Sequence, residues 1–144
     1  MHKVAPAVEA AIEVPLLHIV DAIAAQARSR GLQALGIMGA RWTMAEDFCA
    51  GRLAACGLTP VRAVDADVEL TDRIVFDELT RGVVQNDSRA ALVGVVRRLA
   101  DAGADGVLLG CTELPLILRA ADCPIPVVDS TQAHISSCVT HIVG

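Results

Sequence analysis

Helical and strand patterns alternate along this 144-residue chain, and this alternation constrains its fold more than any other feature. Short, continuously apolar runs are typical of parallel strands that are buried on both faces. They predict strands at 14–20, 34–39, 60–64, 104–109 and 125–129, whereas helical spacing predicts helices at 4–12, 22–30, 43–56, 65–79, 87–102 and 130–143. Strands and helices of these lengths favour an α/β fold with a parallel sheet of about four strands, joined by right-handed crossovers.

Composition excludes several classes of protein. The chain is 53% hydrophobic and 20% charged, which is enough to bury one core, so we expect residues 1–144 to form a single domain. The net charge is −5 and no basic cluster is present, which argues against nucleic acid or an anionic membrane as a partner. No apolar run approaches the ~20 residues of a membrane span. With only 2% aromatic residues, a base-stacking surface is not expected.

The five cysteines do not form the pattern of a disulfide framework or a metal centre. Their number is odd and no secretory signal precedes them, which favours a reducing, cytoplasmic compartment. No Cys-x-x-Cys pair exists and no histidine stands at ligand spacing, so we expect no metal. Four of the cysteines are interpreted as ordinary small apolar side chains: Cys49, Cys56, Cys123 and Cys138.

Cys111 differs from the other four in its surroundings. It follows the apolar run and glycine of Gly106-Val-Leu-Leu-Gly110 and precedes Thr112-Glu113-Leu-Pro. This pattern predicts a buried strand, a turn, and a helix that begins near Thr112. The sulfur would then face the free N–H groups and the positive dipole end of that helix, which favours thiolate over thiol. Cys111 is therefore a candidate base or nucleophile.

Polar residues collect after three of the predicted strands, at 40–43, 111–113 and 129–131. Open parallel sheets bind ligands outside the carboxyl ends of their strands, so we expect these loops to converge on one crevice. Thr43 with Glu46 is interpreted first as a capping box, and Asp129 as a helix cap. His18 fits a hydrogen-bonded core histidine as well as a catalytic role.

The run Gly103-Ala-Asp-Gly-Val-Leu-Leu-Gly-Cys111-Thr-Glu-Leu-Pro-Leu116 resembles the second cysteine motif of the aspartate/glutamate racemase family, and Glu113 resembles its aspartate racemase branch. Four further segments are similar to that family in order and spacing: 15–19, 35–39 with 43–44, 77–82 ahead of 88–89, and 128–131 with His134. The resemblance covers essentially the whole chain. It implies a cofactor-independent racemase of two facing α/β halves, often a homodimer, in which one cysteine from each half flanks the α-carbon of a small acidic amino acid.

The resemblance also implies roles for single residues. Cys111 would be one of the two acid/base groups. Thr112, with backbone N–H groups of the same turn, would hold the substrate carboxylate, and Glu113 would orient or select the ammonium side. Arg81 lies where the family often carries a basic residue that reaches a carboxylate. Ala40 departs from the family, which often has a hydroxyl residue there.

The first half of the family's pattern ends in Cys-Thr-Asn-Thr-Met-His-Lys, and this chain starts at Met1-His2-Lys3. The resemblance therefore implies that the 144 residues correspond to the second half, and that 1–13 and 130–144 would pack on the first. We expect exposed apolar surface, self-association, and little or no racemase activity from the chain alone. Two alternatives stay open: a decarboxylase or isomerase that uses the same paired cysteines, and a non-catalytic remnant or small-ligand binding domain.

Overall fold

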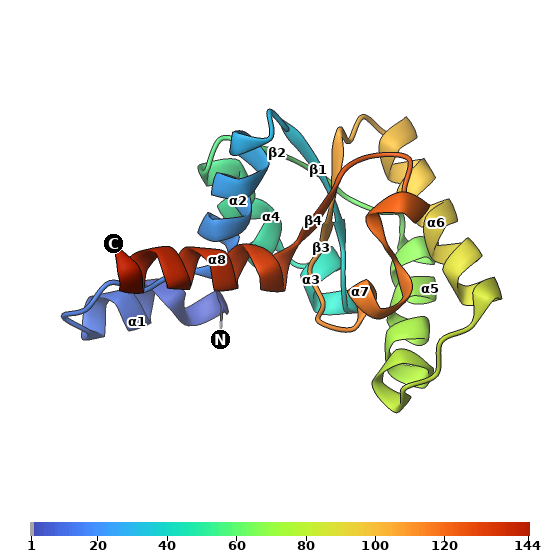
Figure 1. The fold of residues 1–144 in the computed structure, drawn as a ribbon, viewed down its shortest axis with the longest axis horizontal. Coiled ribbons are helices and arrows are strands. Elements are labelled where there is room, and N and C mark those ends of the chain that lie inside the picture. The colour runs from blue at the N-terminus through green and yellow to red at the C-terminus, as the bar shows by residue number, and fades with distance from the viewer. Residues whose placement is uncertain (1) are drawn as a thin grey trace.

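The computed structural model describes residues 2–144, and a four-stranded parallel sheet lies at its centre (Figure 1). The strand order is β2 (Thr59–Val61), β1 (Ala34–Met38), β3 (Gly106–Leu109) and β4 (Val127–Asp129). All three neighbouring pairs are parallel. The expectation of an α/β fold with about four parallel strands is confirmed.

Helices cover both faces of this sheet (Figure 1). On one face lie α2 (Ile19–Ser29), α4 (Asp47–Ala55) and α8 (Ser130–Val143), and on the other lie α5 (Asp65–Asp77) and α6 (Asn86–Asp101). The shorter elements are η1 (His2–Val4), α1 (Ala5–Ala11), α3 (Arg41–Ala45), η2 (Leu79–Arg81), α7 (Leu114–Ile117) and η3 (Ala120–Asp122). Because both faces are covered, the central strands β1 and β3 are apolar throughout rather than alternating.

Two hydrophobic clusters, one on each face, make up the core. Leu35, Ile37 and Leu108 belong to the cluster that includes α2 and α4, whereas Met38 and Leu109 belong to the cluster that includes α5 and α6. Neighbouring residues of a strand point to opposite faces, so each central strand contributes to both clusters. The two central strands, β1 and β3, therefore tie the two halves of the core together.

The amino ends of the central strands are joined by one carboxylate. Asp105 accepts hydrogen bonds from the backbone N–H groups of Gln33 (2.8 Å) and Ala34 (2.9 Å). One residue later, Gly106 leaves room for a neighbouring leucine, since a Cβ there would lie 2.8 Å from Leu32 Cδ1. These contacts fix the register of β3 against β1.

The predicted strand at 14–20 is wrong. Most of this segment is irregular, and α2 begins at Ile19. The His18 ring acts as the helix N-cap, because its Nδ1 accepts a hydrogen bond from the Val20 N–H at 3.1 Å. Val14, which a buried strand would cover, is 69% exposed. The imidazole thus provides the N-cap, and Asp21 lies in the first turn of α2.

The single helix predicted at 43–56 is also wrong, because it is interrupted at Glu46. That residue has extended backbone angles (φ −88°, ψ 160°) and separates α3 from α4. Arg62 stabilises the break by donating a hydrogen bond to the Ala45 carbonyl at 2.8 Å. Glu46 pairs with Lys3 rather than completing a capping box with Thr43, which lies inside α3.

The C-terminal helix α8 packs along α2 and projects beyond the sheet, on the side where α1 lies (Figure 1). Its outer face leaves apolar side chains in solvent: Ile135, Val139, Ile142 and Val143 are all at least 50% exposed. Val4, Ile12 and Val14 near the start of the chain are exposed as well. Among residues 2–144, no helix combines the length and apolar character needed to cross a lipid bilayer.

An ion-pair network connects α1, α2 and α4. The guanidinium of Arg52 donates two hydrogen bonds of 2.7 Å to the Asp21 carboxylate, and one of 3.4 Å to Glu9. The hydrogen bonds from Arg52 hold the pKa of Asp21 below its ordinary value. The ionised form of Asp21 is therefore more stable in the folded chain than in the unfolded one.

Replacing this carboxylate should make stability less dependent on pH. A depressed pKa contributes stability that is present above the unfolded pKa of about 3.9 and is lost as the pH falls through the folded pKa. We expect Asp21→Asn to lower the free energy of unfolding at pH 7 by about 0.5–1 kcal/mol, and the difference from wild type to shrink towards pH 3. Urea unfolding at both pH values measures this.

The control is Asp101→Asn, at the exposed end of α6 and outside the ion pairs of residues 2–144. It should change stability little at either pH. If Asp21→Asn were destabilised equally at pH 7 and pH 3, the lowered pKa of Asp21 would not be the source of the pH dependence.

Candidate active site

Cys111 lies where the chain leaves the central strand β3. All four residues of β3 are buried, and the Gly110 N–H extends the ladder by donating to the Met38 carbonyl at 2.7 Å. Residues 111–113 then form a turn, closed by the Leu114 N–H and the Cys111 carbonyl at 3.3 Å, before the four-residue helix α7. Cys111 is half-buried, and its apolar side packs against the core cluster of α5 and α6. The expected order of strand, glycine, cysteine and helix is present, but the helix is short and begins two residues later than Thr112.

Two glycines allow the carboxyl ends of β1 and β3 to approach closely. A Cβ on Gly110 would lie 3.0 Å from Thr43 Cγ2 and 3.1 Å from the Met38 carbonyl oxygen, and a Cβ on Gly39 would lie 3.2 Å from the Gly110 carbonyl oxygen. Real Cβ atoms are seldom found so close to other atoms. The methyl of Thr43, in α3, packs against both glycines. The turn that carries Cys111 begins directly after Gly110.

One carboxylate oxygen accepts hydrogen bonds from two side chains of the turn. Cys111 Sγ donates to Glu113 Oε2 at 2.9 Å, and Thr112 Oγ1 donates to the same oxygen at 2.8 Å. These two hydrogen bonds hold the pKa of Glu113 below its ordinary value. The structure therefore brings together Cys111, Thr112 and Glu113, three of the four residues that the sequence indicated.

The expectation that this position favours thiolate is wrong for these residues. Burial, and then the hydrogen bond to Glu113, raise the pKa of the Cys111 thiol to about 11. The backbone N–H groups of Glu113 and Leu114 lower it, as the helix start suggested, but their effect is smaller. A carboxylate that accepts the S–H hydrogen bond stabilises the protonated form and repels the thiolate. At neutral pH Cys111 is thus protonated.

Two of the three loops predicted to converge, 40–43 and 129–131, line one small cavity at the carboxyl edge of the sheet, whereas 111–113 does not and only the preceding Gly110 reaches it. A cavity of about 60 Å³ is lined by Thr43 after β1, Gly110 after β3 and Ser130 after β4, together with His2 and Ile19. Small-molecule sites usually occupy roughly 300–1,000 Å³, so this cavity alone is too small for an amino acid. Asp129 caps α8, as expected, by accepting from the Thr131 N–H at 2.8 Å and the Gln132 N–H at 3.2 Å.

Arg81 is the one indicated site residue that lies outside the turn. It is exposed at the end of η2, an element that contacts α7. Arg89, to which sequence reasoning gave no role, supports α7 directly, because its Nε donates to the Ile117 carbonyl at 2.9 Å. Ser88 donates to Glu78 at 2.6 Å and closes the loop between η2 and α6. No sequence signal marked Arg89 as a support of α7, because its partner lies 28 residues away.

The other four cysteines differ in burial: Cys49 is buried, whereas Cys56, Cys123 and Cys138 are partly exposed. All five cysteines are free, and burial raises the pKa of the Cys49 thiol to about 11. Within residues 2–144 the structure has no group of three His, Cys, Asp or Glu side chains that could hold a metal ion.

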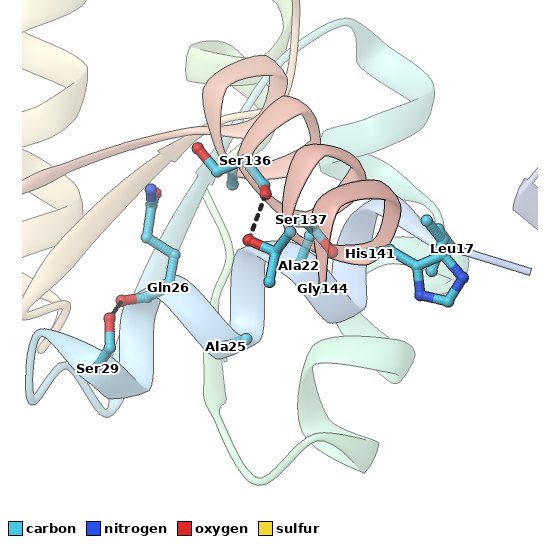
Figure 2. Close-up of a pocket in the computed structure, with 11 residues that line it drawn as sticks. Leu17, Ala22, Ala25, Gln26, Ser29, Ser136, Ser137, His141 and Gly144 are labelled. Carbon is cyan, nitrogen blue, oxygen red and sulfur yellow. Dashed lines mark hydrogen bonds between the residues drawn. The ribbon is translucent and has the colours of Figure 1, made fainter.

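A larger hollow of about 710 Å³ lies between α2 and α8, away from the Cys111 turn (Figure 2). Its hydroxyl groups are partly engaged within their own helices: Ser29 Oγ donates to the Gln26 carbonyl at 2.8 Å, and Thr140 Oγ1 donates to the Ser136 carbonyl at 2.9 Å. It is an open, shallow surface without a cluster of ionisable groups, so it is a weaker candidate than the carboxyl edge.

These features define an α/β domain that presents a thiol, hydrogen-bonded to a carboxylate, at the carboxyl edge of a parallel sheet. The family model described as Asp/Glu/Hydantoin racemase matches residues 1–138. The chain belongs to this family, whose members are racemases and hence isomerases.

Solved structures agree with this assignment. A candidate Asp/Glu racemase from Yersinia pestis is 39% identical with a TM-score of 0.95, and the match covers 100% of this chain and 63% of that one. An aspartate racemase homologue from Pyrococcus horikoshii is 32% identical with a TM-score of 0.92, and the match covers 99% of this chain and 63% of that one. An aspartate racemase from Picrophilus torridus shares the fold. It is 21% identical with a TM-score of 0.64, and the match covers 86% of this chain and 51% of that one. The chain thus spans about 63% of the length of its two nearer relatives named here.

The close approach of β1 and β3 predicts that Gly110 does not tolerate a side chain. We expect Gly110→Ala to destabilise the fold by about 1–3 kcal/mol, because the added methyl meets Thr43 and a backbone carbonyl. Thr43→Ser removes the Cγ2 contact, so Gly110→Ala should be less destabilising in that background. Thermal or urea unfolding of the four proteins measures this coupling.

The control is Gly51→Ala in α4, where an added Cβ meets nothing within 4 Å. It should stabilise the chain slightly, since alanine is the better helix former. Equal effects of the two Gly→Ala changes would contradict the tight contact at Gly110.

The hydrogen bond to Glu113 predicts how Cys111 reacts. Glu113→Gln removes the negative charge beside the sulfur, so the pKa of the Cys111 thiol should fall and its thiolate fraction should rise. Alkylation by iodoacetamide at pH 8 should accelerate about three- to fourfold for each unit by which that pKa falls, because the thiolate fraction rises while the nucleophilicity of the thiolate falls. Peptide mass spectrometry distinguishes Cys111 from the other four thiols.

The matched control is Glu69→Gln, on the exposed face of α5, which should leave the alkylation rate of Cys111 unchanged. An unchanged alkylation rate in Glu113→Gln would show that the Glu113 carboxylate does not raise the pKa of the Cys111 thiol.

Proposed function

We propose that this chain contributes one half of an amino-acid racemase site, in which Cys111 transfers a proton at the substrate α-carbon without a cofactor. The observation that carries the proposal is the hydrogen bond of 2.9 Å between the Cys111 thiol and Glu113 at the end of β3. This hydrogen bond supports a protonated acid at the sheet edge, where open α/β folds bind ligands. Membership of a racemase family supports the same conclusion.

Inversion of a carbon centre needs an acid and a base on opposite faces of that carbon. In the proposed direction, the Cα–H bond breaks and its proton passes to a thiolate on the far face. The S–H bond of Cys111 then breaks and its proton forms the new Cα–H bond on the near face. Cys111 ends as a thiolate and the far group as a thiol, and the reverse reaction restores both.

The substrate class we propose is a small acidic amino acid such as aspartate. Thr112 is exposed beside Cys111, and with the backbone N–H groups of the turn it would bind the α-carboxylate once its hydroxyl turns away from Glu113. The Glu113 carboxylate attracts the ammonium group and repels a carboxylate, which would orient the substrate. Arg81 is exposed on η2, next to α7, and a guanidinium fork suits a carboxylate. We propose that Arg81 binds the side-chain carboxylate of the substrate.

The second thiol and the facing wall of the site are assigned to the part of the relatives that this chain does not cover. We propose that 1–13 and 130–144 pack against that part, and the exposed apolar residues of α8 support this placement. With a single thiol at the edge, the chain alone should be inactive or weakly active. A homodimer and a cytoplasmic, reducing compartment, which keeps the thiols free, are part of the same proposal.

The test measures exchange of the α-proton with solvent. The chain is joined to the part of the Yersinia pestis relative that it does not cover, and L- and D-aspartate are followed by ¹H NMR in deuterated water. We expect the joined protein to exchange the α-proton of both enantiomers, and the chain alone to show little or no exchange. Cys111→Ser should reduce the exchange rate of the joined protein by at least 100-fold.

The matched control is Cys138→Ser, in α8, which should leave the exchange rate unchanged. A folded joined protein that binds aspartate but exchanges neither enantiomer would contradict the racemase proposal. That result would favour the alternative, a non-catalytic small-ligand binding domain.

A further inference from the structure

Two neighbouring, half-buried residues in the first turn of α6 hold the two segments next to the indicated site residues. Ser88 Oγ donates a hydrogen bond to Glu78 Oε2 at 2.6 Å, directly before η2. Arg89 Nε donates to the Ile117 carbonyl at 2.9 Å, in the last residue of α7. One helix therefore supplies both donors, although the acceptors lie 10 and 28 residues away along the chain.

Glu78 connects Ser88 to the backbone of Arg81. The Glu78 side chain accepts from Ser88, while its backbone carbonyl accepts from the Arg81 N–H at 2.9 Å and the Val83 N–H at 3.0 Å. Leu79, the first residue of η2, is 2% exposed and belongs to the core cluster of α5 and α6. The place of the exposed Arg81 guanidinium thus depends on where Glu78 is held.

The backbone of α7 connects Arg89 to the Cys111 turn. This helix has only four residues, and the Leu116 N–H donates to the Glu113 carbonyl at 3.0 Å, which joins the helix to the turn. The Ile117 carbonyl that Arg89 holds is one residue further on. A displacement of Ile117 therefore moves Glu113, whose carboxylate accepts from the Cys111 thiol.

The other interactions of Arg89 stay within its own helix. Its Nη1 donates to Asn86 Oδ1 at 3.3 Å, in the first turn of α6. None of the ion pairs of residues 2–144 includes Arg89. Among the hydrogen bonds and ion pairs of these residues, the contact with α7 is thus the one that the guanidinium makes outside α6.

We propose that Ser88 and Arg89 are positioning residues for proton transfer, which together fix the place of the Arg81 guanidinium relative to the Cys111 thiol. Ser88 acts on Arg81, Arg89 acts on Cys111, and neither touches the substrate. The inference rests on the proposed racemase function. The helix α6 suits this role because its apolar face is anchored in the core by Leu92, Val95, Val96 and Leu99.

The first measurement follows the Cys111 thiol in the chain alone, by pH titration of its ¹³Cβ signal, and requires no activity. Arg89→Met removes the donor to α7, which should weaken the hold of Glu113 on the sulfur. We expect the titration midpoint of Cys111 to fall by about one unit from its raised value of about 11. Arg89→Gln keeps an N–H group near the position of Nε and should keep the wild-type midpoint.

The matched control is Arg97→Met, on the exposed face of the same helix, which should leave the midpoint unchanged. In the Glu113→Gln background, Arg89→Met should lower the midpoint by less than in wild type, because the charged acceptor is already absent. An unchanged midpoint in Arg89→Met that is folded by circular dichroism would overturn the proposal. A fall of equal size in both backgrounds would overturn it too, since Arg89 would then not act through Glu113.

The second measurement uses Ser88→Ala, the smallest change of the pair, in the protein joined to the uncovered part of the Yersinia pestis relative. We expect the KM for L-aspartate to rise about fivefold with kcat nearly unchanged, because binding by Arg81 is weakened. The midpoint of Cys111 in the chain alone should not move. In the Arg81→Gln background, Ser88→Ala should raise KM no further.

The control for this variant is Ser29→Ala, at the exposed end of α2, which should leave KM unchanged. An unchanged KM in an active Ser88→Ala protein, or an equal rise in the Arg81→Gln background, would contradict the role of Ser88. A joined protein without any exchange activity would count against the racemase proposal itself, whereas the Cys111 titration decides the role of Arg89 independently.

Discussion

The candidate site depends on how closely β1 and β3 approach at their carboxyl ends. Gly39 and Gly110 have no side chains, so the Gly110 N–H can reach the Met38 carbonyl at 2.7 Å while Thr43 covers both glycines. This contact extends the ladder by one residue beyond β3. The next residue, Cys111, consequently leaves the sheet at its edge, with its sulfur half-buried rather than in the core.

The position of the thiol then determines its chemistry. Burial and the Glu113 carboxylate both favour the protonated form, and together they outweigh the backbone N–H groups at the start of α7. A thiol with a raised pKa stays protonated in the resting chain, although it is a weaker acid than an ordinary thiol. In the proposed two-base reaction one group must begin protonated, and Cys111 would be that group.

Much of the fold could be predicted because local patterns determine it. The strands at β1 and β3, the helices α5, α6 and α8, and the cysteine at the end of β3 all follow from apolar runs, glycines and caps within a few residues. The errors arise where distant residues decide. Arg62 stabilises the break after Ala45, 17 residues away. The pKa of Cys111 depends on its burial and then on the direction of the Glu113 side chain, which spacing alone does not reveal.

The central claim is that Cys111 is held protonated by its surroundings at the edge of the sheet. Its most direct test is a pH titration of the chain labelled with ¹³C at the cysteine Cβ atoms, with the Cys111 signal assigned by its loss in Cys111→Ser. The structure predicts a midpoint near pH 11 for Cys111. A midpoint at or below the ordinary thiol value of about 8.5 would contradict it.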